Sequence, residues 1–381
     1  MTSKKEVVIV GAGMAGLTAA AYFARENYKV LLLDKNDRSG GLVNTFAYDG
    51  FFFDAGPRAF VNSGIVRPIL KDLGISLDFL ENKISIGIED QLFRVDSMDS
   101  LSEYKRILGN LYPENIEDVE NIISIIDELS EYTKVLYQFD NPNFVDLNNT
   151  RFVFRKLIPW TFKFLNALRK FNQFNMPMED FLKRLTDSQS LIDILTQFFF
   201  RQTPTYFALG YFYVYLDYFY PIGGTGSLAN LLEEKVLFCG GAIKLNKNIV
   251  EVSPSESKAT DSEGNTYHYD HLIWAADLKT LYRNLNSAGL DIELITQIES
   301  ETQPIYSSKG AESVFILFIA VDRPPSYFEA HGGEHMFFTP SRKGLGETNR
   351  GERERLIEDF DEKSKDEIFD WLDKFCELNT Y

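Results

Sequence analysis

The stretch that decides the fold is EVVIVGAGMAGLTAAAYFARENYKVLLLD, residues 6–34. Residues 6–10 form a short apolar run typical of a buried strand, and residues 14–27 are rich in alanine and predict a helix. Residues 29–33 predict a second strand. A strand, a helix and a second strand at this spacing predict two parallel strands joined by a right-handed crossover. The segment therefore predicts an α/β domain of Rossmann-like type.

The turn between the first strand and the helix reads GAGMAG over residues 11–16 and matches the pattern G-x-G-x-x-G. In this pattern Gly11 permits a tight turn, Gly13 lets the backbone approach a pyrophosphate, and Gly16 lets the helix pack closely on the strand. The phosphates then lie at the amino terminus of the helix, where unpaired N–H groups and the helix dipole favour anions. The segment predicts a dinucleotide-binding site.

An acidic residue closes the second strand, because Asp34 follows Gly16 by 18 residues. A carboxylate at this place accepts hydrogen bonds from the 2′-hydroxyl of a ribose and disfavours a 2′-phosphate. Asp34 therefore favours FAD or NAD over NADP.

A second pair of glycines, Gly40 and Gly41, follows this acidic residue. FAD extends beyond its pyrophosphate by a ribityl chain and a flavin ring, and a second backbone stretch has to lie against that half of the cofactor. Paired glycines permit this approach because they carry no side chain. Thr45 closes this glycine segment. The pair favours FAD over NAD and makes an NAD-only dehydrogenase the less favoured alternative.

A predicted hairpin follows directly in residues 45–54, TFAYDGFFFD, where Asp49-Gly50 is a strong signal for a two-residue turn. Gly56-Pro57 then predicts a bend that presents backbone to the flavin ring. We therefore expect FAD to be the cofactor.

These segments resemble a known family. GAGMAG, Asp34, RSGGLVNT (38–45) and DGFFFDAGP (49–57) look like the amino-terminal block of the phytoene desaturase, carotenoid isomerase and amine oxidase superfamily of FAD enzymes. YPIGGTGSL, residues 220–228, resembles the family motif Y-P-x-G-G-x-G-x-L, which precedes a helix near the flavin and the substrate.

Two later segments extend the resemblance. Residues 240–252 resemble the family's next strand, where the backbone of Val250 would meet the adenine edge. LIWAAD, residues 272–277, resembles the family's V-V-x-x-A-D strand and loop. The fingerprint and the resemblance together assign to cofactor binding Gly11, Gly13, Met14, Ala15, Gly16, Asp34, Lys35, Gly40, Gly41, Leu42, Gly56, Pro57, Arg58, Val250 and Ala275.

The resemblance implies an FAD-dependent oxidoreductase of the desaturase or isomerase type. Its substrate would be lipophilic, with carotenoids and other isoprenoids as candidates, and hydride would pass to the flavin. Protoporphyrinogen oxidase-like, amine oxidase-like and sugar-nucleotide mutase-like enzymes share the amino-terminal block and remain alternatives. No residue is assigned as a catalytic acid or base, since in flavin chemistry the protein mainly orients the substrate.

Two positions depart from the family pattern. Leu42 stands where many members carry an arginine, which removes one phosphate-side contact. We also find no second glycine-rich segment after residue 300, so we expect the chain to lack the carboxy-terminal FAD-binding segment. A truncated, non-catalytic dinucleotide-binding protein is therefore a further alternative.

The 381 residues suffice for two or three domains of about 150 residues. We expect a discontinuous FAD-binding domain from residues 1–85 and 219–285, and a helical and mixed substrate domain from residues 86–218 and 286–381. Local patterns further predict mostly helix over 65–137, a glycine-rich turn and helix over 223–238, a strand over 243–252, a hairpin and buried strand over 257–277, a strand over 313–321, and an acidic helix with a capping box at Ser364 and Glu367.

The net charge of −17 argues against a nucleic-acid partner, because phosphate binding needs a clustered basic surface. With 2 cysteines and 4 histidines, no disulfide framework and no metal site are expected. His331 and His335 have the spacing of a zinc helix, but the two glycines between them cost about 1 kcal/mol each in a helix, so a loop entering a strand is predicted. No signal peptide and no membrane-spanning run is found, and a cytoplasmic location is expected.

Two segments are unusual in composition. Residues 147–178 contain no acidic residue but carry six Lys and Arg residues interleaved with Phe, Leu and Trp, which is typical of a helix on an anionic membrane surface. The alternative is a helical cap whose basic residues pair with acidic groups elsewhere. Residues 206–221 are strongly aromatic and fit either a core or the lining of a lipophilic pocket.

Overall fold

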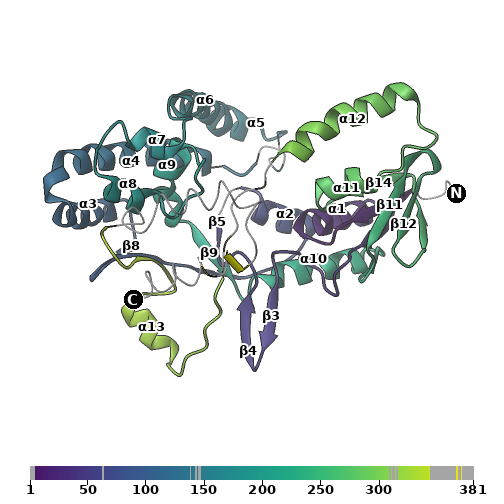
Figure 1. Ribbon diagram of the computed structural model, residues 1–381, viewed down its shortest axis with the longest axis horizontal. Helices are drawn as coiled ribbons and strands as arrows, with labels where there is room; N and C mark the ends of the chain where they lie inside the picture. Colours follow the sequence, from purple (N-terminus) through teal and green to yellow (C-terminus); the bar gives the residue numbers. More distant parts are fainter. Residues whose placement is uncertain are drawn as a thin grey trace. The chain divides into compact units, whose positions relative to one another are not determined.

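The computed structural model describes residues 5–61, 64–137, 139–141, 144, 147–308, 310, 314, 316–343, 366–367 and 370 (Figure 1). The chain divides into two compact units. Unit 1 consists of Met1–Phe60, Ile65–Glu81 and Phe219–Val321, and unit 2 of Val61–Gly64, Asn82–Tyr218 and Asp322–Tyr381. This division places residues 286–321 in unit 1, and the functional domain boundaries predicted above stay a prediction.

Unit 1 is built on a four-stranded parallel sheet. Its strand order is β10 (Ala242–Lys244), β2 (Lys29–Leu33), β1 (Glu6–Val10) and β14 (His271–Trp274). The central pair runs in register from Glu6 opposite Lys29 to Val10 opposite Leu33. A parallel sheet of this kind is covered on both faces, which explains why the two central strands are almost continuously apolar.

The side chains of β1 alternate between two cores. Val7 and Ile9 pack under the helices α1 (Met14–Arg25) and α10 (Gly226–Phe238). Val8 and Val10 face the second sheet of unit 1, β11 (Ile249–Ser253), β12 (Lys258–Asp261) and β13 (Thr266–His268). The alanines of α1 allow close helix packing, since the three at 20, 21 and 24 are buried. The predicted α/β fold is confirmed.

The predicted hairpin is present as β3 (Thr45–Tyr48) and β4 (Phe51–Asp54), which extends from the rest of unit 1 (Figure 1). Asp49 and Gly50 both have positive φ, 47° and 81°, as a two-residue hairpin turn of this sequence requires. Unit 1 also contains α2 (Val66–Leu73), β6 (Phe79–Glu81), most of β9 (Tyr218–Pro221), α11 (Leu278–Asn284) and α12 (Ile292–Ser307).

Unit 2 combines a small mixed sheet with a helical layer. Strand β7 (Ile84–Ile88) is central, antiparallel to β8 (Gln91–Val95) and parallel to β15 (His335–Thr339). Its largest hydrophobic core joins these strands to several of the helices. The α-helices described in unit 2 are α3 (Ser100–Leu111), α4 (Ile116–Tyr137), α5 (Thr150–Phe152), α6 (Ile158–Gln173), α7 (Met178–Leu182), α8 (Gln189–Thr196), α9 (Thr205–Tyr215) and α13 (Pro325–His331). A π-helical turn, Val153–Leu157, joins α5 to α6.

Several local predictions were wrong. The largely helical interpretation of residues 65–137 fails at 79–95, because β6, β7 and β8 occupy this stretch and all five residues of β7 are buried between two partner strands. The single strand over 243–252 is instead two strands in different sheets, β10 and β11. The strand over 313–321 is absent from the described residues of that segment, where Val314 and Leu317 are about 70% exposed.

Other local predictions are confirmed. Helix α10 follows the glycine-rich turn, and β12 and β13 form the hairpin through Gly264, whose φ is 85°. The loop after His331 leads into β15. The acidic helix predicted around residue 367 lies almost entirely outside the described residues. Among the helices that the structure describes, none is both long and apolar enough to cross a membrane.

Candidate functional site

Two glycines of the first loop, Gly11 and Gly16, have no room for a side chain. A Cβ atom at Gly11 would lie 2.6 Å from the carbonyl oxygen of Ala275, and a Cβ atom at Gly16 would lie 1.8 Å from the carbonyl oxygen of Gly11. Gly11 also has a φ of +104°, which side chains of L residues rarely adopt. The loop is therefore a tight turn held by backbone contacts at the carboxyl end of β1.

Gly13 differs from these two glycines because no atom lies within 4 Å of the position of its Cβ. It is the N-cap of α1, and no side chain caps this helix end. Met14 and Ala15 begin the first turn, whose backbone N–H groups therefore lack a side-chain acceptor at the cap. Open space in front of an uncapped helix start is the arrangement that a pyrophosphate needs.

Asp34 supports this loop through its carboxylate. The Ala12 N–H donates to Asp34 Oδ2 at 2.6 Å, and the Asn36 N–H donates to Asp34 Oδ1 at 2.8 Å. The residue is buried, with 8% of its surface exposed. Each carboxylate oxygen can accept a second hydrogen bond, so capacity for a ribose hydroxyl remains. Sequence reasoning missed the bond to the glycine loop.

The second glycine pair lies directly beside the first loop. Gly40 forms a parallel bridge with Gly13, and its N–H donates to the carbonyl oxygen of Ala12 at 2.7 Å. A Cβ atom at Gly41 would lie 3.2 Å from the Cα atom of Gly13. The structure thus brings together two glycine motifs that are about 28 residues apart in the chain.

The remaining predicted positions differ in their contacts and in their exposure. Gly56 packs on Leu42, since a Cβ atom at Gly56 would lie 2.2 Å from the carbonyl oxygen of Leu42, whose side chain is 81% exposed. Ala275 continues β14, and its N–H donates to the carbonyl oxygen of Val10. Lys35, Pro57 and Arg58 are exposed, and Val250 lies on β11 with 43% of its surface exposed.

A network of hydrogen bonds around Asp54 was not predicted. Asp54 Oδ1 accepts from Thr45 Oγ1 at 2.6 Å and from both the N–H and Oγ1 of Thr225 at 3.0 Å. Asp54 Oδ2 accepts from the hydroxyl of Tyr220 at 2.6 Å. Burial raises the pKa of Asp54, but the hydrogen bonds from Thr45, Tyr220 and Thr225 outweigh it and hold that pKa below its ordinary value. A carboxylate that ends a strand beside Gly56-Pro57 was the available sequence signal.

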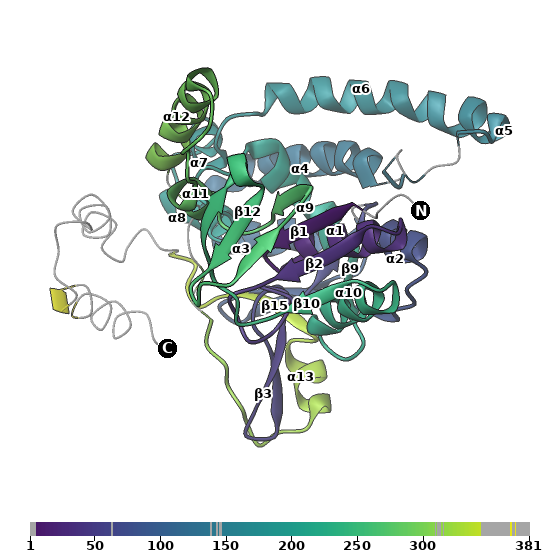
Figure 2. The ribbon, with the colours of Figure 1, turned by 90° about the vertical axis from the view of Figure 1, so that its right-hand side faces the viewer.

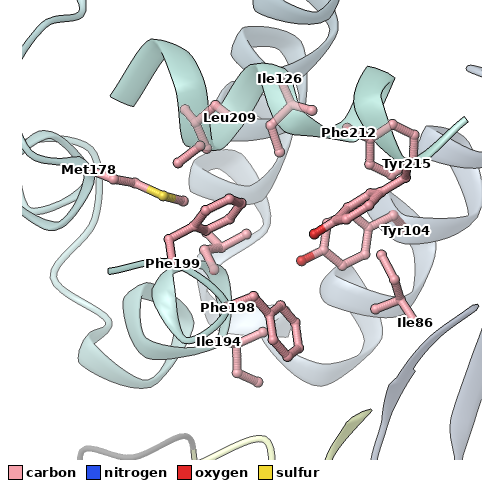
Figure 3. A pocket seen from close by; sticks show the side chains of 12 residues that line it. Ile86, Tyr104, Ile126, Met178, Ile194, Phe198, Phe199, Leu209, Phe212 and Tyr215 are labelled. Carbon is pink, nitrogen blue, oxygen red and sulfur yellow. The ribbon is translucent and has the colours of Figure 1, made fainter. Parts of the chain in front are cut away.

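Unit 2 contains a small aromatic cavity of about 40 Å³ (Figure 3). It is lined by residues of β7, α3, α4, α7, α8 and α9 and of the segment after α8. Phe198, Phe199 and Phe212 contribute rings, and the hydroxyls of Tyr104 and Tyr215 point in the same direction (Figure 3). Burial raises the pKa of both tyrosines, so both are neutral hydrogen-bond donors. The aromatic run at 206–221 thus supplies both core and cavity lining.

Helix α6 lies alongside α4 (Figure 2). Together with the π-helical turn that precedes it, α6 exposes a stripe of apolar side chains, which we call the apolar stripe of α6. Phe154, Ile158, Phe162 and Leu165 follow one another at helical spacing, and their exposed fractions are 69%, 39%, 71% and 54%. Opposite this stripe, Trp160 Nε1 donates to the carbonyl oxygen of Val135 at 2.8 Å. The stripe therefore results from the sequence pattern of a helix that packs with only one face.

The basic residues of this segment divide into two groups. Lys170 pairs with Glu128 at 2.5 Å. Among the described residues, the structure shows no ion pair for Arg151, Arg155, Lys156, Lys163 or Arg169. The interpretation as a charge-paired cap therefore holds for one residue of the six.

The comparisons with known proteins agree with the arrangement in unit 1. The model of the family described as flavin containing amine oxidoreductase matches residues 14–366. The chain belongs to this family. Family membership confirms FAD as the cofactor, and the glycine loops of unit 1 fit it because no atom lies within 4 Å of the Cβ position of Gly13.

The curated relatives and solved structures support the predicted resemblance. A phytoene desaturase of Fusarium fujikuroi is 40% identical over 74 residues, which cover 19% of this chain and 13% of the relative. A 4,4′-diapolycopene oxygenase of a Methylomonas species is 24% identical over 350 residues, covering 86% of this chain and 68% of the relative. An oxidoreductase structure from Methanosarcina mazei has a TM-score of 0.52 at 13% identity, over 78% of this chain and 65% of that one, and supports the fold.

Proposed function

We propose that this chain is an FAD-dependent oxidoreductase of the desaturase or isomerase type that acts on a lipophilic substrate. The observation that carries the proposal is the contact between the two glycine loops at the uncapped start of α1, in a member of a flavin-containing family. A bound flavin supplies the hydride-accepting chemistry. The protein's residues hold the cofactor and orient the substrate.

The cofactor-holding residues divide by the part of FAD that they meet. Gly11, Gly13 and the amides of Met14, Ala15 and Gly16 would receive the pyrophosphate. Asp34 and Lys35 would meet the ribose, and Val250 the adenine edge. Gly40, Gly41, Leu42, Gly56, Pro57, Arg58 and Ala275 would meet the ribityl and flavin half. These assignments extend the sequence predictions and rest on the backbone geometry of the two loops.

The aromatic cavity of unit 2 supports a lipophilic substrate. One water molecule needs about 10–15 Å³ of such space, so a cavity of about 40 Å³ has room for about three waters or for a small apolar group of similar size. We propose that it receives the end of a hydrophobic chain. The curated relatives are named for phytoene, diapophytoene and diapolycopene, which favours an isoprenoid or carotenoid chain.

The apolar stripe of α6 supports delivery of such a substrate from a membrane surface. Two phenylalanines, Phe154 and Phe162, are about 70% exposed. They are accompanied by cationic side chains that form no ion pair within the part of the chain that the structure describes. This combination suits binding at the boundary between lipid head groups and acyl chains of an anionic bilayer. Peripheral membrane contact through residues 147–178 is part of the proposal.

An anaerobic reduction experiment tests the proposed activity. The FAD-loaded protein is mixed without oxygen with phytoene in detergent micelles, and the visible absorbance of the flavin is followed. We expect the absorbance to bleach as hydride passes from substrate to flavin. The same protein with a primary amine serves as the comparison, and bleaching with the amine alone would favour the amine oxidase-like alternative.

A further inference from the structure

Asp54 connects the base of its own hairpin with a segment that lies more than 160 positions later in the sequence. Its carboxylate accepts hydrogen bonds from Thr45 at the start of the hairpin and from Tyr220, which lies 166 positions later on β9. It also accepts from the backbone and the hydroxyl of Thr225, at the N-cap of α10. All four donors come from unit 1.

Thr45 tightens the same junction from the hairpin side. Its Oγ1 accepts from the Gly226 N–H at 2.9 Å, at the first residue of α10. A Cβ atom at Gly224 would lie 2.5 Å from Thr45 Oγ1, and a Cβ atom at Gly226 would lie 2.6 Å from the backbone nitrogen of Thr45. The base of the hairpin and the turn at 223–226 therefore interlock without space between them.

This junction continues into the second glycine loop. The Ala55 N–H, next to Asp54, donates to the carbonyl oxygen of Asn44 at 2.8 Å. Gly56 packs on Leu42, which follows the Gly41 that approaches Gly13. The chain from residue 41 to residue 45 thus leads directly from the proposed pyrophosphate site to the residues that Asp54 holds.

We propose that Asp54 is a positioning residue that fixes the hairpin base and the turn at 223–226 as one unit, and thereby shapes the half of the cofactor site beyond the pyrophosphate. This inference rests on the proposed function. Gly223 and Gly224 both have φ above +90°, so the turn has wide backbone freedom once its anchors are lost. The loop at α1 depends on Asp34 instead, and should keep its shape without Asp54.

The hydrogen bond between Tyr220 and Asp54 can be tested by the substitution Asp54→Asn. Burial and the bond to Asp54 raise the pKa of Tyr220, so its hydroxyl stays protonated and donates to the carboxylate. In Asp54→Asn, one of the two oxygens becomes an NH₂ group that cannot accept a hydrogen bond, so the side chain can no longer accept from Tyr220 on one side and from Thr45 and Thr225 on the other. The variant keeps the size of the side chain but loses the acceptor. Tyr220→Phe removes the donor and provides an independent test of the same bond.

The experiment compares FAD with ADP, which carries the adenosine and the two phosphates but no flavin half. Fluorescence quenching gives the Kd of FAD, and competition gives that of ADP. Because hydrogen bonds to charged groups are stronger than those between neutral groups, we expect Asp54→Asn to weaken FAD binding by at least about tenfold while ADP binding changes by less than about twofold. Tyr220→Phe should also weaken FAD binding more than ADP binding.

Asp261 and Tyr267 supply the matched control, since the Tyr267 hydroxyl donates to Asp261 Oδ2 at 2.7 Å in the second sheet of unit 1. Asp261→Asn and Tyr267→Phe should leave the ratio of the FAD and ADP affinities unchanged. Equal weakening of both ligands by Asp54→Asn and Tyr220→Phe, or no weakening of either, would overturn the inference alone. A wild-type protein that binds no FAD would overturn the proposed function, and the inference with it.

Discussion

The glycines of the first loop do different work although they belong to one motif. Gly16 is enclosed, whereas Gly13 faces open space before the helix. A methyl group at Gly16 has to displace the backbone of Gly11, but a methyl group at Gly13 meets no protein atom. The two positions therefore separate the stability of the loop from its capacity to bind a pyrophosphate.

We predict opposite outcomes for two alanine substitutions. Gly16→Ala should lower the free energy of unfolding by about 1–3 kcal/mol, because overpacking of a tight site has this cost. Gly13→Ala should lower that free energy by less than about 1 kcal/mol, the cost of alanine at an N-cap, but weaken FAD binding, since the methyl group enters the space left for the phosphates. Urea unfolding and FAD titration of both variants measure this. Equal stability of the two variants would contradict the geometry of the loop.

The carboxylate of Asp261 gives a prediction on pH. Burial raises the pKa of Asp261, but hydrogen bonds from Asn265, Tyr267 and the Glu263 N–H outweigh it and lower that pKa to about 2. The folded pKa lies below the unfolded one, so this stabilisation is complete above about pH 4 and is lost as the pH falls toward about 2. Asp261→Asn should therefore show a smaller loss of unfolding free energy between pH 5 and about pH 3 than the wild type. An equal loss of unfolding free energy in the variant and the wild type would contradict this role of Asp261.

At the scale of elements, those specified by neighbouring residues could be predicted from the sequence, whereas strands that pair with distant segments could not. The strand–helix–strand unit at residues 6–33 and the hairpin at Asp49-Gly50 were predictable, because each is specified by neighbouring residues. Strand β7 was missed because Glu89-Asp90, the turn to its antiparallel partner β8, is not one of the usual hairpin pairs, and because its other partner, β15, begins only at His335. A short apolar run cannot reveal such a distant partner.

The candidate site shows the same division. The glycine loops follow from a motif with a known physical purpose. The network of Asp54 with Tyr220 and Thr225 could not be predicted, since nothing local indicates that residues 166 and 171 positions later supply its donors. Likewise, the bond from the Ala12 N–H to Asp34 follows from how β2 lies beside β1.

Helix α6 gives a prediction on membrane binding. A buried phenylalanine contributes about 1.5–3 kcal/mol, so replacing Phe154 and Phe162 by serine should reduce binding to vesicles of phosphatidylserine and phosphatidylcholine by at least about tenfold. Vesicle flotation at low and high salt measures this. Phe238→Ser is the matched control, because Phe238 is 85% exposed on α10 of unit 1. Equal loss in the control, or no wild-type binding, would contradict the membrane proposal.

The cavity gives a second prediction at this scale. Ala208 lines it and is buried, so Ala208→Val adds two methyl groups toward the space proposed for the end of the substrate. We expect the KM for a long polyene to rise while FAD affinity and stability stay close to those of the wild type. Steady-state kinetics with chains of decreasing length measure this, and shorter chains should be affected less. A uniform effect on every chain length would exclude this role for the cavity.

At the scale of the whole molecule, the matched segments span 13% of the fungal phytoene desaturase and 65% of the archaeal oxidoreductase. The family is shown over most of the chain, but the activity of the whole protein is our proposal. Its central claim is that the glycine loops of unit 1 hold FAD in this chain. Everything proposed about substrate and positioning depends on this step.

Titration of the purified chain with FAD tests that claim most directly. We predict saturable quenching of flavin fluorescence and a perturbed visible flavin spectrum, both displaced by excess ADP and both weakened in Gly13→Ala. A protein that stays colourless, and that changes neither flavin signal at any FAD concentration, would contradict the account.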